Sequence, residues 1–117
     1  MIEWKAMNFT RLLIFALLAL VAWNLFKTTS IDLAASDISP EHDIVMFSAP
    51  WCGYCDQARA FLEAERVEFL EVDIESSTEA NRRFREAGGR GVPLIFIGEE
   101  RIVGFSAPAY GQALDRL

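Results

Sequence analysis

Two cysteines, Cys52 and Cys55, are the residues of this 117-residue chain whose type and spacing offer the clearest chemistry. Only two residues separate them, so on a helix their sulfur atoms would lie one turn apart and within reach of each other. A thiolate at Cys52 would attack a disulfide and form a mixed disulfide, which Cys55 would then resolve. The spacing therefore predicts thiol–disulfide exchange, in either direction.

The flanking sequence places this pair where a strand ends and a helix begins. Residues 43–48 form a short apolar run that predicts a buried strand, and residues 53–65 show a helical rhythm. At a helix start, unpaired N–H groups and the helix dipole favour an anion. We therefore expect the pKa of the Cys52 thiol to lie below the free value of about 8.5.

Two other interpretations of the cysteine pair are weaker. An inert structural disulfide would close too small a ring to constrain much of the chain. A metal site would need further ligands, and the chain has no other cysteine and one histidine, so we predict no metal site. That histidine, His42, is expected to face solvent just before the first strand rather than to act as a base.

The remaining pattern completes an α/β domain. We expect further strands over 67–74, 93–97 and 101–104, and helices that begin after Ser76 and Ser106. Ser76 with Glu79 resembles a capping box. The helix between the first two strands makes them parallel, whereas the tight turn between the last two makes them antiparallel. The predicted fold is a mixed four-stranded sheet with helices on both faces, and its expected core includes Phe61, Leu62, Phe84, Leu94 and Phe96.

Pro93 begins the third predicted strand, where its missing N–H costs no sheet hydrogen bond. We predict a cis Val92–Pro93 bond packed against the cysteine pair, an ordinary trans proline being the alternative. The backbone of Val92 would then be free to pair with an extended substrate.

Other candidate substrate-binding residues lie near these two motifs. Trp51 and Tyr54 flank the sulfurs and would form an apolar platform, although Trp51 would equally serve to shield the end of the sheet. Gly104-Phe105-Ser106 closes the fourth strand, where Gly104 permits close approach and Ser106 caps the last helix. The N–H groups of that helix start would hold a carboxylate if they lie near the cysteines.

Together, Cys-Gly-Tyr-Cys, Gly-Val-Pro and Gly-Phe-Ser resemble the thioredoxin-like superfamily, and over residues 43–117 the chain is most similar to a glutaredoxin. The resemblance implies a thioredoxin-like (glutaredoxin) fold and a protein disulfide oxidoreductase. It implies that Cys52 is the nucleophile, Cys55 the resolving thiol and Val92-Pro93 the substrate-binding segment. It implies no bound cofactor, with glutathione as a candidate co-substrate.

The chain departs from the glutaredoxin pattern at Ala49, where glutaredoxins commonly carry a lysine that pairs with a glutathione carboxylate. Residues 49–53 and 90–93 look instead like thioredoxin. Arg90 is a candidate for the missing positive charge, and an arginine that simply faces water is the alternative.

Residues 9–26 are almost entirely apolar. The run lies between the length of a signal-peptide core, about 7–15 residues, and that of a spanning helix, about 20. Flanking tryptophans favour an uncleaved anchor through residues 9–26; a cleaved signal peptide and a buried core helix are the alternatives. Lys5 and Arg11 lie before the uncharged core of the run, which begins at Leu12, and only Lys27 follows it. This predicts a cytoplasmic amino terminus and a periplasmic or equivalent location for the rest.

We therefore divide the chain into a membrane anchor or signal segment (1–27), a linker (28–40) and a glutaredoxin-like domain (41–117). The net charge of −6 lies in residues 39–117, where 14 acidic residues face eight arginines. This acidity argues against a nucleic-acid partner. Disulfide-containing proteins are the expected partners, with glutathione as a candidate. A non-catalytic, membrane-tethered assembly module and a thiol pair that delivers Cu(I) are the alternative functions.

Overall fold

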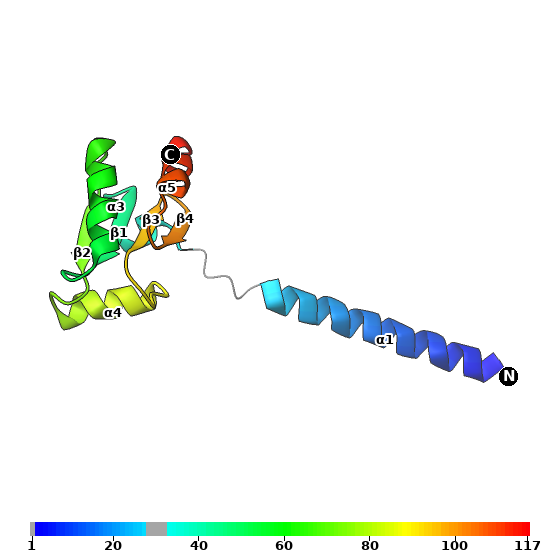
Figure 1. The fold of residues 1–117 in the computed structure, drawn as a ribbon. Helices are drawn as coiled ribbons and strands as arrows, with labels where there is room; N and C mark the ends of the chain where they lie inside the picture. Colours follow the sequence, from blue (N-terminus) through cyan, green and yellow to red (C-terminus); the bar gives the residue numbers. More distant parts are fainter. Residues whose placement is uncertain (1, 28–32) are drawn as a thin grey trace. The chain divides into compact units, whose positions relative to one another are not determined.

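The computed structural model describes residues 2–27 and 33–117, which belong to two separate units (Figure 1). The first unit contains helix α1 (Ile2–Lys27). The second is a compact α/β unit whose described part runs from Leu33 to Leu117.

Helix α1 contains a stretch, Asn8–Phe26, of 19 residues with a mean hydropathy of 2.0. By length and composition it is able to cross a membrane. None of this stretch is buried among the described residues, so the buried-core interpretation finds no support. A membrane anchor and a signal sequence both fit this helix.

A mixed four-stranded sheet forms the centre of the compact unit. Its strands are β1 (Ile44–Ser48), β2 (Leu70–Asp73), β3 (Leu94–Ile97) and β4 (Glu100–Val103), in the order β2-β1-β3-β4. β1 and β2 are parallel, whereas β3 is antiparallel to both β1 and β4. This topology confirms the predicted mixed sheet.

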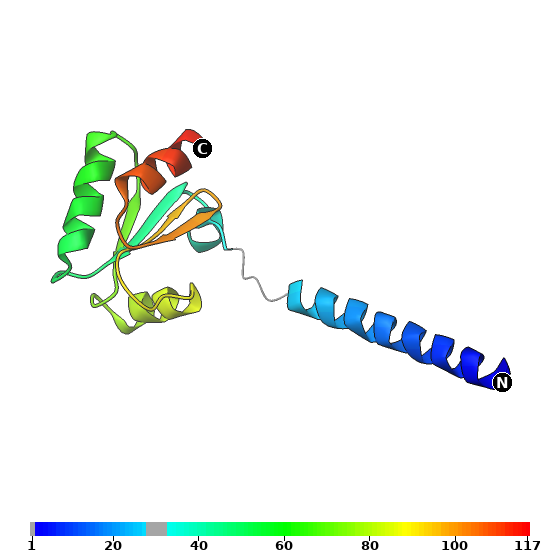
Figure 2. The same cartoon turned by 45° about the vertical axis from the view of Figure 1, so that its right-hand side comes forward.

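Helices cover both faces of the sheet, as predicted (Figure 2). α3 (Gly53–Ala64) and α5 (Ala107–Asp115) pack on one face, and α4 (Thr78–Glu86) packs on the other. The two central strands, β1 and β3, are buried along their whole length, because alternate side chains enter the two cores. Of the predicted core residues, four are buried and Phe61 is half-buried against the core.

A short helix, α2 (Ala35–Ile38), lies within the predicted linker. Ala35 is completely buried and its N–H donates to the Gly98 carbonyl at 2.8 Å. Arg83 on α4 donates to the Ile38 carbonyl at 2.9 Å. Residues 33–40 thus pack on the domain instead of forming an open linker, because Leu33, Ala35 and Ile38 join the core on the α4 face. Residues 28–32 lie outside the described part, and the domain boundaries stay a prediction.

Three local predictions need correction. β2 has four residues rather than the eight of 67–74, and the flanking apolar side chains reach the core from outside the strand. The cap of α4 is Ser77, not Ser76, because the Ser76 hydroxyl already donates to the Asp73 carbonyl at 2.6 Å. His42 is half-buried and its Nδ1 lies 2.9 Å from the Ser39 hydroxyl, so it does not simply face solvent.

Candidate active site

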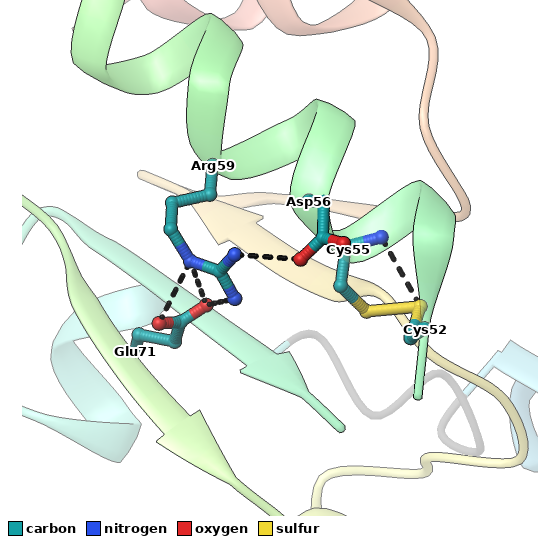
Figure 3. A network of polar contacts seen from close by, with 5 residues as sticks. All are labelled: Cys52, Cys55, Asp56, Arg59 and Glu71. Atoms are coloured by element: carbon teal, nitrogen blue, oxygen red, sulfur yellow. Dashed lines mark hydrogen bonds and ion pairs between the residues drawn. A yellow bond between two sulfur atoms is a disulfide. The ribbon is translucent and has the colours of Figure 1, made fainter. Parts of the chain in front are cut away.

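The cysteine pair lies at the junction between β1 and α3. Cys52 is the N-cap residue of α3 and is joined to Cys55, in the first turn, by a disulfide whose Cα atoms are 5.2 Å apart (Figure 3). Cys52 is 5% exposed, whereas Cys55 is completely buried. Cys52 is therefore the more accessible of the two residues.

The sulfur of Cys52 accepts a hydrogen bond from the backbone N–H of Cys55 at 3.1 Å (Figure 3). This donor is one of the N–H groups that the first turn of a helix leaves unpaired. When the disulfide is reduced, the same N–H group and the helix dipole are placed to stabilise a thiolate on Cys52. The position at the helix start agrees with the sequence prediction.

The Val92–Pro93 peptide bond is cis, as predicted. Val92, the residue before Pro93, packs against the cluster formed by Ala49, Cys52 and Cys55. Within residues 33–117 the backbone N–H and carbonyl of Val92 form no hydrogen bond. The Pro93 carbonyl, by contrast, accepts from the Gly104 N–H at 2.8 Å. An unpaired backbone segment thus lies directly beside the disulfide.

The Gly104-Phe105-Ser106 segment is joined to Pro93 through the N–H of Gly104. Gly104 has a φ of 82°, a conformation that favours glycine, and its carbonyl accepts from the Tyr110 hydroxyl at 2.9 Å. The ring of Phe105 packs edge-on against Tyr110, so its side chain belongs to the core. Ser106 caps α5 as predicted, with its hydroxyl accepting from the Ala109 N–H at 3.4 Å. Burial raises the pKa of Tyr110 to about 12.

Two aromatic side chains stand out from the surface beside the sulfurs. Trp51 is 69% exposed and Tyr54 is 65% exposed. The indole N–H of Trp51 donates to Glu75 at 2.7 Å, which fixes the ring without covering it. This exposure favours the platform interpretation of Trp51 over shielding of the sheet. Glu75 lies 24 residues from Trp51 in the sequence, and no sequence pattern predicted this contact. The neighbouring Ile74 N–H donates to the Ser48 carbonyl at 2.9 Å, which brings Glu75 close to Trp51.

An ion-pair network that the sequence analysis missed fastens α3 to β2. Arg59 pairs with Asp56 at 2.8 Å and with Glu71 at 2.6 Å (Figure 3). Hydrogen bonds to these two carboxylates raise the pKa of Arg59. Because both partners satisfy the guanidinium, this cation holds the helix in place and is not available to a ligand.

A redox-active type of cysteine pair at the start of the helix that follows β1, beside a cis-proline segment, defines a redox protein of thioredoxin-like fold. The comparisons with known proteins narrow this class. The glutaredoxin family model matches residues 44–102. A glutaredoxin of Neisseria meningitidis is 37% identical over 65 residues, which cover 54% of this chain and 76% of the relative.

Solved structures agree on the fold. A glutaredoxin from Archaeoglobus fulgidus superposes with a TM-score of 0.59 at 18% identity, covering 67% of this chain and 91% of that one. A buckwheat glutaredoxin–glutathione complex gives a TM-score of 0.57 at 21% identity, covering 71% and 83%. The chain belongs to the glutaredoxin family, a family of thiol–disulfide oxidoreductases.

Proposed function

We propose that this chain reduces or forms disulfides in protein substrates, with Cys52 as the attacking thiol and Cys55 as the resolving thiol. The observation that carries the proposal is the asymmetry of the pair. Cys52 lies at the helix start, is the more accessible of the two, and its sulfur accepts a backbone N–H, whereas Cys55 is completely buried. An accessible, stabilised thiolate is the better nucleophile toward an external disulfide.

In the reducing direction, the Cys52 thiolate attacks one sulfur of the substrate disulfide. The substrate S–S bond breaks, its electron pair leaves on the other sulfur, and that thiolate takes a proton from solvent. Deprotonated Cys55 then attacks the sulfur of Cys52, which restores the Cys52–Cys55 disulfide and releases the second substrate thiol. Two electrons pass from the dithiol to the substrate, and the reverse sequence oxidises a dithiol.

The groups around the sulfurs are suited to hold an extended substrate during this exchange. We propose that the free backbone groups of Val92 pair with the substrate backbone beside Cys52. The exposed rings of Trp51 and Tyr54 would cover apolar parts of the substrate. Gly104 and Ser106 would act indirectly, by holding Pro93 and the start of α5 in place.

The roles of the two cysteines are tested by single substitutions. Cys52→Ser should abolish disulfide reduction, whereas Cys55→Ser should still attack and should accumulate mixed disulfides that mass spectrometry detects. Undiminished reductase activity in Cys52→Ser would reject the mechanism. Full function of the double Cys→Ser variant in cells, without any thiol chemistry, would favour the non-catalytic assembly module.

We further propose that protein disulfides are preferred over glutathione-linked ones. The position where glutathione-binding relatives commonly carry a lysine is Ala49, which is buried and uncharged. Glutathione is bound in the buckwheat complex, so it stays a candidate co-substrate. Rates with a protein disulfide and with a glutathione mixed disulfide, measured on the same preparation, test the preference; a faster glutathione reaction would contradict it.

We propose that helix α1 anchors the protein in a membrane, with the amino terminus in the cytoplasm and the redox domain outside. The exposed apolar stretch of 19 residues supports an anchor. Lys5 and Arg11 at the amino-terminal end of the stretch, against Lys27 alone after it, support the orientation. Resistance to alkaline extraction and protease access to the redox domain from the outer side are the expected results. A mature protein that begins after residue 27 would instead identify a cleaved signal sequence.

A further inference from the structure

An open pocket of about 440 Å³ adjoins the Val92 segment, on the α4 side of the sheet. Its lining contains two arginines and no carboxylate: Gly88, Arg90, Gly91, Leu94, Arg101 and Val103. The other described pockets all include acidic residues in their linings. In a domain with a net charge of −6, a purely cationic pocket is selective for anions.

The two arginines of the pocket are held differently, and both keep free donors. Arg90 is exposed, and its side chain has no hydrogen bond or ion pair among residues 33–117. Arg101 donates one N–H to the Gly88 carbonyl at 2.7 Å, which fixes its guanidinium at the pocket and leaves its other donors unused. Guanidinium groups bind carboxylates through paired hydrogen bonds.

Most other arginines near the sheet are already neutralised or bonded. Arg59, Arg82 and Arg116 each form ion pairs with carboxylates, and Arg83 donates to the Ile38 carbonyl. Arg90 and Arg101 differ because they line a pocket together without a carboxylate. Their charge is therefore available to a partner.

The pocket adjoins the cysteine site along the chain. Gly91, in its lining, precedes Val92, which packs against the cluster of Ala49, Cys52 and Cys55. Arg90 lies two residues before Val92, and two residues of extended chain span at most about 7 Å. A substrate strand paired with Val92 would therefore run toward Arg90 over about two residues. The exposed side chain of Val103 (62%) adds an apolar wall for the methylene groups of a long acidic side chain.

We propose that this pocket binds an acidic side chain of a protein substrate, about two residues from the substrate's reactive cysteine. The proposal rests on the proposed function, because it needs a peptide at Cys52. It makes the Arg90–Arg101 pocket a specificity site for protein substrates, set apart from the cysteine pair that carries out the exchange.

The test compares matched peptides, each with one cysteine in a mixed disulfide with 2-mercaptoethanol. One set carries Glu two residues before or after the cysteine, and the other carries Gln there. For the full chain at low ionic strength we expect a higher kcat/KM for one of the Glu peptides, by about fivefold, the size of a modest ion pair. Arg90→Gln combined with Arg101→Gln should remove this preference and leave the Gln-peptide rate unchanged. Arg66→Gln, an exposed arginine outside the pocket, is the matched control.

The outcomes separate this inference from the proposed function. If the chain reduces no peptide at all, the proposed function fails. If it reduces Glu and Gln peptides equally well, or if the preference survives in the double variant, only the acidic-side-chain site is overturned. In a second arm, the Gln peptides are linked to glutathione. If the double variant slows only this reaction, the arginines bind a glutathione carboxylate and the inference about protein substrates is wrong.

Discussion

The two ends of the sheet differ in how their polar groups are used. At the β3–β4 turn, the Gly98 carbonyl accepts from Ala35 and its N–H donates to the Asp43 carbonyl at 2.8 Å, and Arg116 pairs with Glu100. At the cysteine end, the backbone groups of Val92 are unpaired within residues 33–117, and the rings of Trp51 and Tyr54 face solvent. The polar groups at the β3–β4 turn thus bond within the domain, whereas the backbone groups of Val92 remain free to bond a partner.

This difference predicts that substitutions at the two ends of the sheet affect different properties, stability at one end and substrate recognition at the other. Groups that bond each other within the fold mainly hold it together, so substitutions there should change the free energy of unfolding. Groups left unpaired beside a reactive sulfur are available to a partner, so substitutions there should change turnover and leave stability nearly constant. The following experiments test this division, from the largest expected effect to the smallest.

Ala35→Glu should lower the free energy of unfolding by about 3 kcal/mol, because it places an unpaired charge in a fully buried position of α2. Urea denaturation measures the effect. Ser36→Glu, on the exposed side of the same helix, should change stability by less than about 0.5 kcal/mol. Equal stabilities for the two variants would show that α2 does not close this end of the domain.

Trp51→Ala should lower kcat/KM for protein disulfides about twentyfold, equivalent to about 1.8 kcal/mol, because the exposed ring is lost as a contact surface. Its stability should stay within about 0.5 kcal/mol of the parent protein. Glu75→Gln keeps an acceptor for the indole N–H and should leave both quantities nearly unchanged. A large loss of stability in Trp51→Ala, with normal turnover, would assign the ring to the fold instead.

Arg83→Gln should lower the free energy of unfolding by about 1.5 kcal/mol, because it removes a charged donor from the Ile38 carbonyl. Thermal and urea denaturation at neutral pH measure the change. Arg85→Gln, an exposed neighbour on α4, is the control and should be nearly silent. An effect of the same size in both variants would point to general charge rather than to this bond.

Tyr110→Phe should cost about 1 kcal/mol at neutral pH, because the hydroxyl donates to the Gly104 carbonyl. Burial raises the pKa of Tyr110 to about 12 from an ordinary value of 10.0. The folded protein therefore keeps this proton at a pH where the unfolded chain releases it, so the parent protein should lose stability as the pH rises from about 10 to 12. The Phe variant should lack this part of the loss; parallel stability curves would contradict the assignment.

Local sequence patterns were enough to predict most of the fold. The apolar runs gave β1 and β3, the helical rhythm gave α3, and Ser106 was identified as the cap of α5. Sequence patterns failed to predict the shortest helix, α2. α2 has only four residues, too short for a period to be recognised, and its burial depends on the partner surface of α4 and the sheet.

The residues of the candidate site also fall into those that the sequence predicted and those that it did not. Cys52, Cys55 and Pro93 were found because their chemistry and their neighbours in sequence are distinctive. Glu75, Glu71 and Arg101 were missed because each acts through a partner at least 12 residues away, as in the Arg59–Glu71 pair. Such pairs depend on how distant segments are placed in the fold, which local sequence patterns do not show.

The sequence by itself determined the dithiol, its place between a strand and a helix, and an apolar segment long enough to cross a membrane, because each depends on residues close together in the chain. Only the tertiary structure decided which cysteine is accessible, which backbone groups beside it stay unpaired and which arginines keep an uncompensated charge. These properties depend on how distant segments cover and bond one another, and charge and accessibility are set by that packing rather than by residue type.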